Sequence, residues 1–197
     1  MPRPALHPTD ELLDAARDLV VEAGPRAAGI RDIARRSGAP SGSLYHRFGS
    51  RDELVARAWL RAVRRFQAGY LEALGQEEPR EAAACAVRFG VAFALSAPAD
   101  ARLLLDYSRA GLLDSEPEGE VADEVARVNA PLEAAVRDLA VRVFGDAGVE
   151  AIERTSYAVI DLPLAVVRRH LLAGTLGEDT AGRLEPAVLA LLDKEAR

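Results

Sequence analysis

The sequence from Gly29 to Arg51, GIRDIARRSGAPSGSLYHRFGSR, predicts two short helices joined by a tight turn. In the first helix, Ile30, Ile33 and Ala34 recur at a spacing that places them on one face. The run Ser37-Gly38-Ala39-Pro40 ends that helix, because glycine adopts the left-handed conformation at low cost and proline cannot extend a helix. A second helix is expected directly after the turn, with proline at its start.

The second helix is too short and too polar to form a core by itself. Leu44 and Phe48, four residues apart, are expected to face inward. The residues left facing outward are Ser41, Gly42, Ser43, Tyr45, His46 and Arg47. Hydroxyl, imidazole and guanidinium groups on a protruding helix suit hydrogen bonding to phosphates and base edges. The pattern is typical of a helix-turn-helix, whose second helix enters the major groove of DNA.

The segment from about Thr9 to Trp59 resembles the DNA-binding domain of the TetR family of bacterial transcriptional regulators. The resemblance lies in Leu12-Leu13-Asp14-Ala15-Ala16, Ile33-Ala34, Ser37-Gly38, Gly42-Ser43-Leu44-Tyr45-His46, Phe48 and Ser50-Arg51-Asp52-Glu53-Leu54. The combined spacing of these residues is specific. The resemblance implies an all-α protein with an N-terminal three-helix DNA-binding domain at residues 1–52. A larger helical-bundle domain for ligand binding and dimerisation is expected at residues 53–197.

By this resemblance, the recognition helix supplies most of the DNA contacts. Ser41, Ser43, Tyr45 and His46 are expected to touch the duplex, and Gly42 allows the backbone to approach the phosphates closely. The alternative for Tyr45 is an aromatic ring packed at the domain boundary, and for His46 an idle surface imidazole.

Three arginines are also candidate DNA contacts. Arg51 opens a helix, where its guanidinium and the exposed backbone N–H groups can grip a phosphate together. Arg31 is expected to reach a guanine edge or a phosphate. The family commonly has lysine where this chain has Ser41, and Arg47 is expected to compensate for the missing charge.

The charge is distributed unevenly along the chain. The 197 residues carry a net charge of −6, which does not suggest a nucleic-acid binder. Up to Phe66, however, there are 12 Arg against 8 Asp and Glu, and the rest of the chain has 13 basic against 23 acidic residues. A basic N-terminal third followed by an acidic body is expected of a DNA reader with a separate second domain.

Helical patterns continue through the remainder of the chain, with Ser50 expected to cap the first of them. The predicted helices span residues 50–74, 80–95, 99–113, 120–144, 149–173 and 184–194. Pro131 and Pro163 are expected to kink or break two of them.

A homodimer is expected, because one recognition helix reads too few bases. Two copies about 34–36 Å apart read two half-sites on one face of DNA. The dimer surface is predicted on helices 149–173 and 184–194, which carry more apolar residues than one buried side needs. The alternative is that these helices complete an intrachain core.

The resemblance also implies a pocket for a small-molecule effector in the larger domain. The candidate lining residues are Phe66, Tyr70, Phe89, Phe93 and Tyr107, with Arg88 or Arg109 as polar anchors. Plain core packing is the alternative for these aromatic side chains. The effector is expected to favour a dimer whose recognition helices are wrongly spaced, which releases a palindromic operator. The predicted function is therefore a ligand-responsive repressor, with an activator of the same fold or a helical adaptor protein as alternatives.

Several other classes of protein find no support in the sequence. It has no GxSxG, P-loop, GxGxxG or HExxH motif, and His7, His46 and His170 do not have metal-ligand spacing, so no enzyme, metal site or cofactor is predicted. The single Cys85 excludes an intrachain disulfide and is expected to be a small buried side chain, with a sensor thiol as the alternative. No signal peptide is expected, because the amino terminus has no long apolar run, and no apolar run reaches membrane-spanning length, so a cytoplasmic location is predicted.

Overall fold

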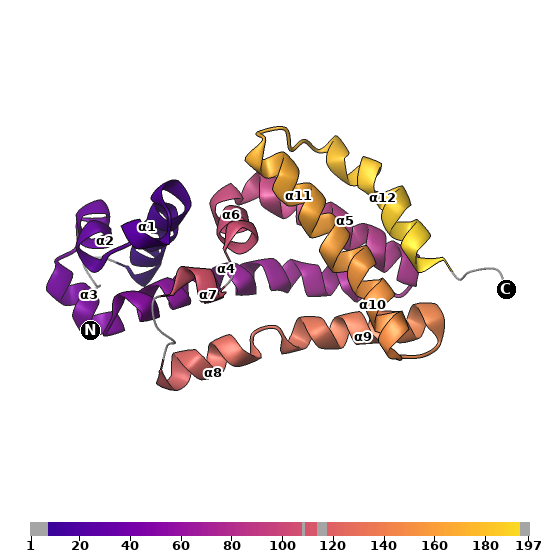
Figure 1. Ribbon diagram of the computed structural model, residues 1–197, viewed down its shortest axis with the longest axis horizontal. Coiled ribbons are helices and arrows are strands. Elements are labelled where there is room, and N and C mark those ends of the chain that lie inside the picture. Colours follow the sequence, from indigo (N-terminus) through magenta and orange to yellow (C-terminus); the bar gives the residue numbers. More distant parts are fainter. Residues whose placement is uncertain (1–7, 108, 114–117, 194–197) are drawn as a thin grey trace, which may run out of the picture. The chain divides into compact units, whose positions relative to one another are not determined.

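The computed structural model describes residues 8–107, 109–113 and 118–193, and all regular elements within these ranges are helical. In chain order they are α1 (Thr9–Ala23), the 3-10 turn η1 (Pro25–Ala27), α2 (Ile30–Ser37), α3 (Ser41–Phe48), α4 (Arg51–Leu74), α5 (Pro79–Ser96), α6 (Pro98–Asp106), α7 (Arg109–Leu112), α8 (Gly119–Arg127), α9 (Ala130–Phe144), α10 (Val149–Ser156), the π turn η2 (Tyr157–Asp161), α11 (Leu162–Leu172) and α12 (Asp179–Leu192) (Figure 1). The predicted all-α fold class is confirmed. Residues 1–8 hold three prolines and are expected from the sequence to form a disordered arm; except for Pro8, they fall outside the described residues.

The chain divides into two compact units, each built from two separate stretches of sequence. The first unit joins the described residues up to 63 with those of 99–127, and the second joins 64–98 with those from 128 onward. Helix α4 runs without a break from one unit into the other. The functional boundary expected after residue 52 stays a prediction, while packing places the first half of α4 with the helix-turn-helix.

The core of the first unit draws on side chains from far apart in the sequence. Leu12, Ile33 and Leu44 are fully buried in it, from α1, α2 and α3. Leu103 of α6 and Leu112 of α7 belong to the same core. Burial of one such leucine contributes roughly 1.5–3 kcal/mol. The core of the helix-turn-helix is therefore completed by α6 and α7, and α6 begins about fifty residues after the end of α3.

In the second unit, α5 packs against α11 and α12, and α9 packs against α5 and α10 (Figure 1). Buried alanines and valines of α5, such as Ala83, Ala86 and Val87, meet a core that includes Val159 and Val188. Small side chains allow helices to approach one another closely, which suits this alanine-rich sequence.

The proline breaks occur as predicted. The stretch 120–144 divides into α8 and α9, with Pro131 in the first turn of α9, and the stretch 149–173 divides at η2, with Pro163 in the first turn of α11. A single helix over residues 99–113 was wrongly predicted, because α6 and α7 are separate. In one straight helix, residues 103 and 112 would point in opposite directions, so the break lets both leucines enter the same core.

No single helix in the described ranges is long and apolar enough to cross a membrane, although the bent pair α5–α6 passes the same test by length and composition.

Candidate nucleic-acid interface

The turn between α2 and α3 has the geometry that its sequence predicts. Gly38 takes the left-handed conformation, with φ of 71°, directly after α2 ends at Ser37. The Ser37 hydroxyl donates to the Ile33 carbonyl at 2.8 Å and accepts from the Ala39 amide at 3.4 Å. Pro40 then precedes the first residue of α3. Because these contacts satisfy the end of α2 locally, the turn fixes how α3 leaves it.

Helix α3 has one buried face and one open face, as the sequence predicts. Leu44 and Phe48 lie in the core of the first unit. On the open face, Tyr45 keeps 54% of its surface exposed, and His46 is also exposed. Gly42 is exposed, whereas Ser41, Ser43 and Arg47 are half-buried. The core therefore anchors a short helix whose hydroxyl, imidazole and guanidinium groups can reach a partner.

Arg51 has a role inside the first unit that sequence reasoning missed. Its guanidinium donates to the carbonyl of Pro25 at 2.6 Å and to the carbonyl of Leu112 at 2.8 Å. It also pairs with Asp52 at 2.5 Å. Hydrogen bonds from a charged group to backbone carbonyls hold η1 and the end of α7 to the start of α4. A phosphate contact from Arg51 stays a prediction, and the arrangement gives the side chain a structural role.

The first turn of α4 confirms another prediction. The hydroxyl of Ser50 accepts a hydrogen bond from the Glu53 amide at 3.1 Å, as expected of a cap residue. Asp52 and Glu53 lie in this first turn, where their charge complements the helix dipole.

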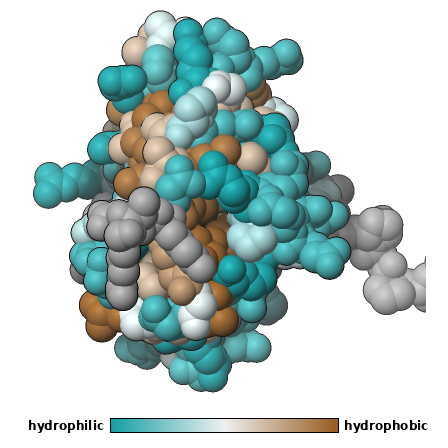
Figure 2. All heavy atoms as spheres, turned by 90° about the vertical axis from the view of Figure 1, so that its right-hand side faces the viewer, coloured by the Kyte–Doolittle hydropathy of each residue, from teal (hydrophilic) through white to brown (hydrophobic). Residues whose placement is uncertain are grey.

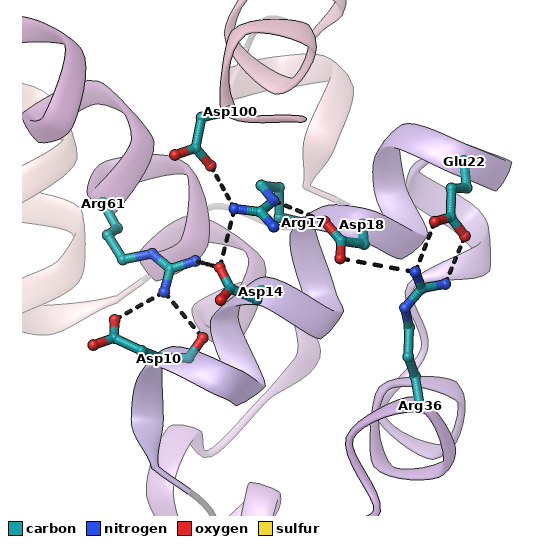
Figure 3. Close-up of polar contacts among 8 residues, drawn as sticks. All are labelled: Asp10, Asp14, Arg17, Asp18, Glu22, Arg36, Arg61 and Asp100. Atoms are coloured by element: carbon teal, nitrogen blue, oxygen red, sulfur yellow. Dashed lines mark hydrogen bonds and ion pairs between the residues drawn. The ribbon is translucent and has the colours of Figure 1, made fainter. Parts of the chain in front are cut away.

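A network of ion pairs ties α1 to α4 and α6 (Figure 3). Its centre is Arg17 of α1, whose guanidinium lies 2.8 Å from Asp100, 3.0 Å from Asp14 and 2.7 Å from Asp18. Asp100 is only 3% exposed. Arg61 of α4 then pairs with Asp14 and, at 2.8 Å, with Asp10. A buried carboxylate needs such a partner, because desolvation without one is costly.

The network continues to α2 through a third arginine (Figure 3). Arg36 donates to both carboxylate oxygens of Glu22, at 2.5 and 2.7 Å, and lies 3.8 Å from Asp18. The hydrogen bonds from Arg36 lower the pKa of Glu22 below its ordinary value. Arg36 therefore braces α2 against α1, while Arg31, exposed on α2, and Arg47 of α3 remain the candidate basic contacts to DNA.

Comparison with known proteins identifies the segment of residues 12–58, which we call the head. Residues 12–58 match the family described as bacterial regulatory proteins, tetR family. The N-terminal helix-turn-helix segment is therefore of the TetR type. The HTH-type transcriptional repressor KstR2 of Rhodococcus jostii is 53% identical over 45 residues, which are 23% of this chain and 22% of that relative. The match to the curated relatives thus spans about a fifth of their length, on the order of one DNA-binding head.

Solved structures of TetR-like regulators resemble nearly the whole chain. A TetR-like transcriptional regulator from Rhodococcus sp. RHA1 aligns over 98% of this chain and 100% of that one, with a TM-score of 0.73 and 22% identity. The fatty acid degradation regulator FadR from Bacillus halodurans aligns over 96% and 100%, with a TM-score of 0.71 and 16% identity. At such identities the likeness establishes the TetR-like fold beyond the head.

Four of the predicted effector contacts come together in the second unit, and we call Phe66, Tyr70, Phe89 and Phe93 the aromatic cluster. Phe66 stacks on Tyr70 with ring centroids 4.7 Å apart, and Phe93 meets Phe66 edge-on at 5.3 Å. Phe89 lies 5.8 Å from Phe66 and 6.1 Å from Phe93. Phe66, Phe89 and Phe93 are half-buried, so the cluster is not sealed within the core.

The other three predicted effector contacts lie apart from the aromatic cluster or outside the described side chains. Tyr107 belongs to the first unit, where its hydroxyl donates to the Val20 carbonyl at 3.3 Å. Arg88 is exposed on α5 and pairs with Glu81 and, at 3.4 Å, with Glu185. The side chain of Arg109 is not among those described.

Cys85, expected to be a small buried side chain, is only half-buried. It lies 3.2 Å from a Glu81 carboxylate oxygen and 3.1 Å from the Arg88 guanidinium. Burial raises the pKa of the Cys85 thiol, and the hydrogen bond to Glu81 raises it further. A raised pKa disfavours the reactive thiolate that a sensor requires. Within the described residues, no group of three His, Cys, Asp or Glu side chains is placed to hold a metal ion.

Proposed function

We propose that this chain is a TetR-family transcriptional repressor that binds a palindromic operator as a homodimer and is released by a small-molecule effector. The observation that carries the proposal is the open face of α3, held in a head that is 53% identical over 45 residues to a named repressor. An exposed tyrosine on an anchored short helix is suited to base and phosphate contact rather than to core packing.

In the proposed complex, the open face of α3 enters the major groove. Tyr45, Ser43 and His46 contact base edges and phosphates, and Ser41 and Gly42 bring the start of the helix close to the backbone. Arg31 and Arg47 supply the positive charge that a phosphate backbone attracts. Arg36 and Arg17 serve the fold, because their guanidinium groups are held by carboxylates of α1 and α6.

The proposed homodimer uses the outer sides of α11 and α12. Leu164 and Leu172 of α11 remain 47% and 54% exposed, and they lie on one face because they are eight residues apart. Helix α12 exposes the small residues Gly182, Ala187 and Ala190. Apolar surface is also visible between polar regions on the face shown in Figure 2. Leucines set against small side chains suit close packing with a second copy across a twofold axis.

The proposed effector contact is the aromatic cluster. Phe89 contacts α4 at Gly69, where an added Cβ would come within 2.2 Å of the ring. Half-buried phenylalanine rings around such a close approach favour an effector with a substantial apolar part. An apolar group can also be buried among these rings without the cost of desolvating an unpaired charge.

Selection of bound duplexes from a random pool tests the proposal directly. We expect a palindrome, and a steep fall of affinity with salt. Tyr45→Ala should weaken binding to the selected duplex roughly tenfold or more, because it removes contacts on α3 without disturbing the core. Arg35→Ala, which removes an exposed arginine paired with Asp32, is the matched control on α2.

Arg51→Ala separates the two roles of that arginine. It should reduce stability in the absence of DNA, since the carbonyls of Pro25 and Leu112 lose their donor. If low-salt titrations show no preference for any sequence over scrambled competitor, the proposed function is wrong. Binding of a protein partner with little salt dependence would instead favour the adaptor alternative.

A further inference from the structure

The hydroxyl of Tyr70 contacts a backbone carbonyl at the point where a long helix changes its register. Tyr70 is buried on α4, and its hydroxyl donates to the carbonyl of Val159 in η2. In a regular helix that carbonyl accepts from the amide of residue 163. Residue 163 is proline, which has no N–H to donate. Tyr70 therefore supplies the hydrogen bond that Pro163 removes.

The backbone at this point is a π turn, which contains one residue more than a regular helical turn. The amide of Leu162 donates to the carbonyl of Tyr157, five residues earlier. An inserted residue rotates the helix that follows by about 100° relative to the helix that precedes it. The register at η2 therefore decides which side of α11 faces outward, including the exposed Leu164 and Leu172.

A second buried polar side chain of α4 contacts the backbone at the other proline break. The amide of Gln67 donates to the carbonyl of Val128 at 2.9 Å, and to the Asn129 side chain at 3.3 Å. This break lies just before Pro131. Side chains one turn apart on α4 thus hold both interrupted helices, so neither interruption leaves an unsatisfied buried carbonyl at these contacts.

The ring of Tyr70 faces a different neighbourhood from its hydroxyl. It stacks on Phe66 at 4.7 Å and lies 6.2 Å from Phe89, as part of the aromatic cluster. Burial raises the pKa of Tyr70, so the hydroxyl stays protonated and remains a donor at physiological pH. One side chain therefore joins the proposed effector contact to the turn that orients α11.

We propose that Tyr70 couples the aromatic cluster to the exposed face of α11, by holding the Val159 carbonyl in the π register that Pro163 creates. An effector that displaces the Tyr70 ring withdraws the hydroxyl from Val159. The π turn then loses its external donor, and α11 presents a different side to a second copy. The inference rests on the proposed effector and dimer surfaces, and it identifies how one regulates the other.

Hydrogen exchange of the full chain tests the first step. Tyr70→Phe keeps the ring and removes the hydroxyl, so amide exchange over residues 157–166 should become roughly tenfold faster. Thr155→Val is the matched control, because it removes another buried hydroxyl, which donates to the Ala151 carbonyl at 2.8 Å one turn before η2. The control should leave exchange over 157–166 unchanged. Equal exchange in Tyr70→Phe and the wild type would overturn the proposal.

Pro163→Ala provides a rescue that a merely structural role for Tyr70 does not predict. Alanine restores the amide that can donate to Val159, so adding Pro163→Ala to Tyr70→Phe should return exchange over 157–166 to within about twofold of Pro163→Ala alone. Strictly additive effects of the two substitutions would contradict the shared carbonyl.

Sedimentation tests the second step. The dimer dissociation constant should rise several-fold, on the order of tenfold, in Tyr70→Phe and stay unchanged in Thr155→Val. Unchanged dimerisation in Tyr70→Phe would overturn the coupling, even where the wild type binds a selected duplex. Conversely, the wild type could dimerise but prefer no DNA sequence, while Tyr70→Phe shows the expected exchange and dimerisation effects. That result would contradict the proposed repressor function and still support the coupling.

Discussion

The two units treat their buried polar groups in opposite ways. In the first unit the buried polar side chains are the carboxylates Asp52 and Asp100, both held by arginines. In the second unit they are the uncharged groups of Gln67, Thr155 and Thr180, together with the hydroxyl of Tyr70. An ion pair stabilises the fold only while both of its groups are ionised, and salt weakens it. A hydrogen bond between uncharged groups depends far less on pH and salt. The ion pairs of the second unit, such as Arg88 with Glu81, lie at exposed positions, so the stability of buried polar contacts should respond to pH chiefly in the first unit.

Removal of apolar contacts that the first unit receives from α6 should have the largest effect. Leu103→Ala should lower the free energy of unfolding by about 2–5 kcal/mol, because the side chain is only 1% exposed in the core of the first unit. The single tryptophan, Trp59, packs against that core, so its fluorescence in a urea titration reports on this unit. Leu95→Ala, at an exposed position, is the control. An unchanged midpoint in Leu103→Ala would show that the head does not depend on α6.

Removal of the buried charge is the next sharpest test. Asp100→Asn should cost about 1–3 kcal/mol, less than loss of an isolated buried pair, since Arg17 keeps Asp14 and Asp18 as partners. Asp32→Asn breaks an exposed pair with Arg35 and should cost at most about 1 kcal/mol. Equal losses in the same urea titrations would mean that burial does not distinguish the two pairs.

The smallest expected effect is a change in pH dependence. The pKa of Glu22 is lowered below 4.5 by its hydrogen bonds from Arg36, so its contribution to stability is present above pH 4.5 and is lost as the pH falls through the lowered value. Glu22→Gln should therefore flatten the decline in stability on acidification below pH 4.5. Thermal unfolding from pH 6 to about pH 3 measures this. An identical decline in wild type and Glu22→Gln would exclude Glu22 as a contributor.

The head was predictable from sequence because its determinants are local. Gly38, Pro40 and the spacing of Leu44 and Phe48 act within one or two turns, and they specify both the helix-turn-helix and its open face. The proline breaks were predictable for the same reason. Pro131 and Pro163 each remove one donor from the backbone, whatever surrounds them.

The partners that complete these local features could not be predicted. Arg51 meets the Leu112 carbonyl 61 residues away, Arg17 meets Asp100 83 residues away, and Tyr70 meets Val159 89 residues away. No periodicity connects such positions, since the contacts depend on tertiary packing alone. The sequence did carry one usable signal. Pro163 leaves the carbonyl of residue 159 without its amide, so a buried donor was to be expected near that carbonyl.

Because α6 and α7 supply part of its core, the head cannot be transferred to another protein as an independent domain. A chimaera that joins residues 1–52 to the remainder of another protein would lack Leu103 and Leu112. It would also lack the Leu112 carbonyl that accepts a hydrogen bond from Arg51. The proposed DNA specificity is therefore better changed by substitutions on the open face of α3 within the native chain. The buried contacts with α6 and α7 would then stay unchanged, and only solvent-exposed residues of α3 would be substituted.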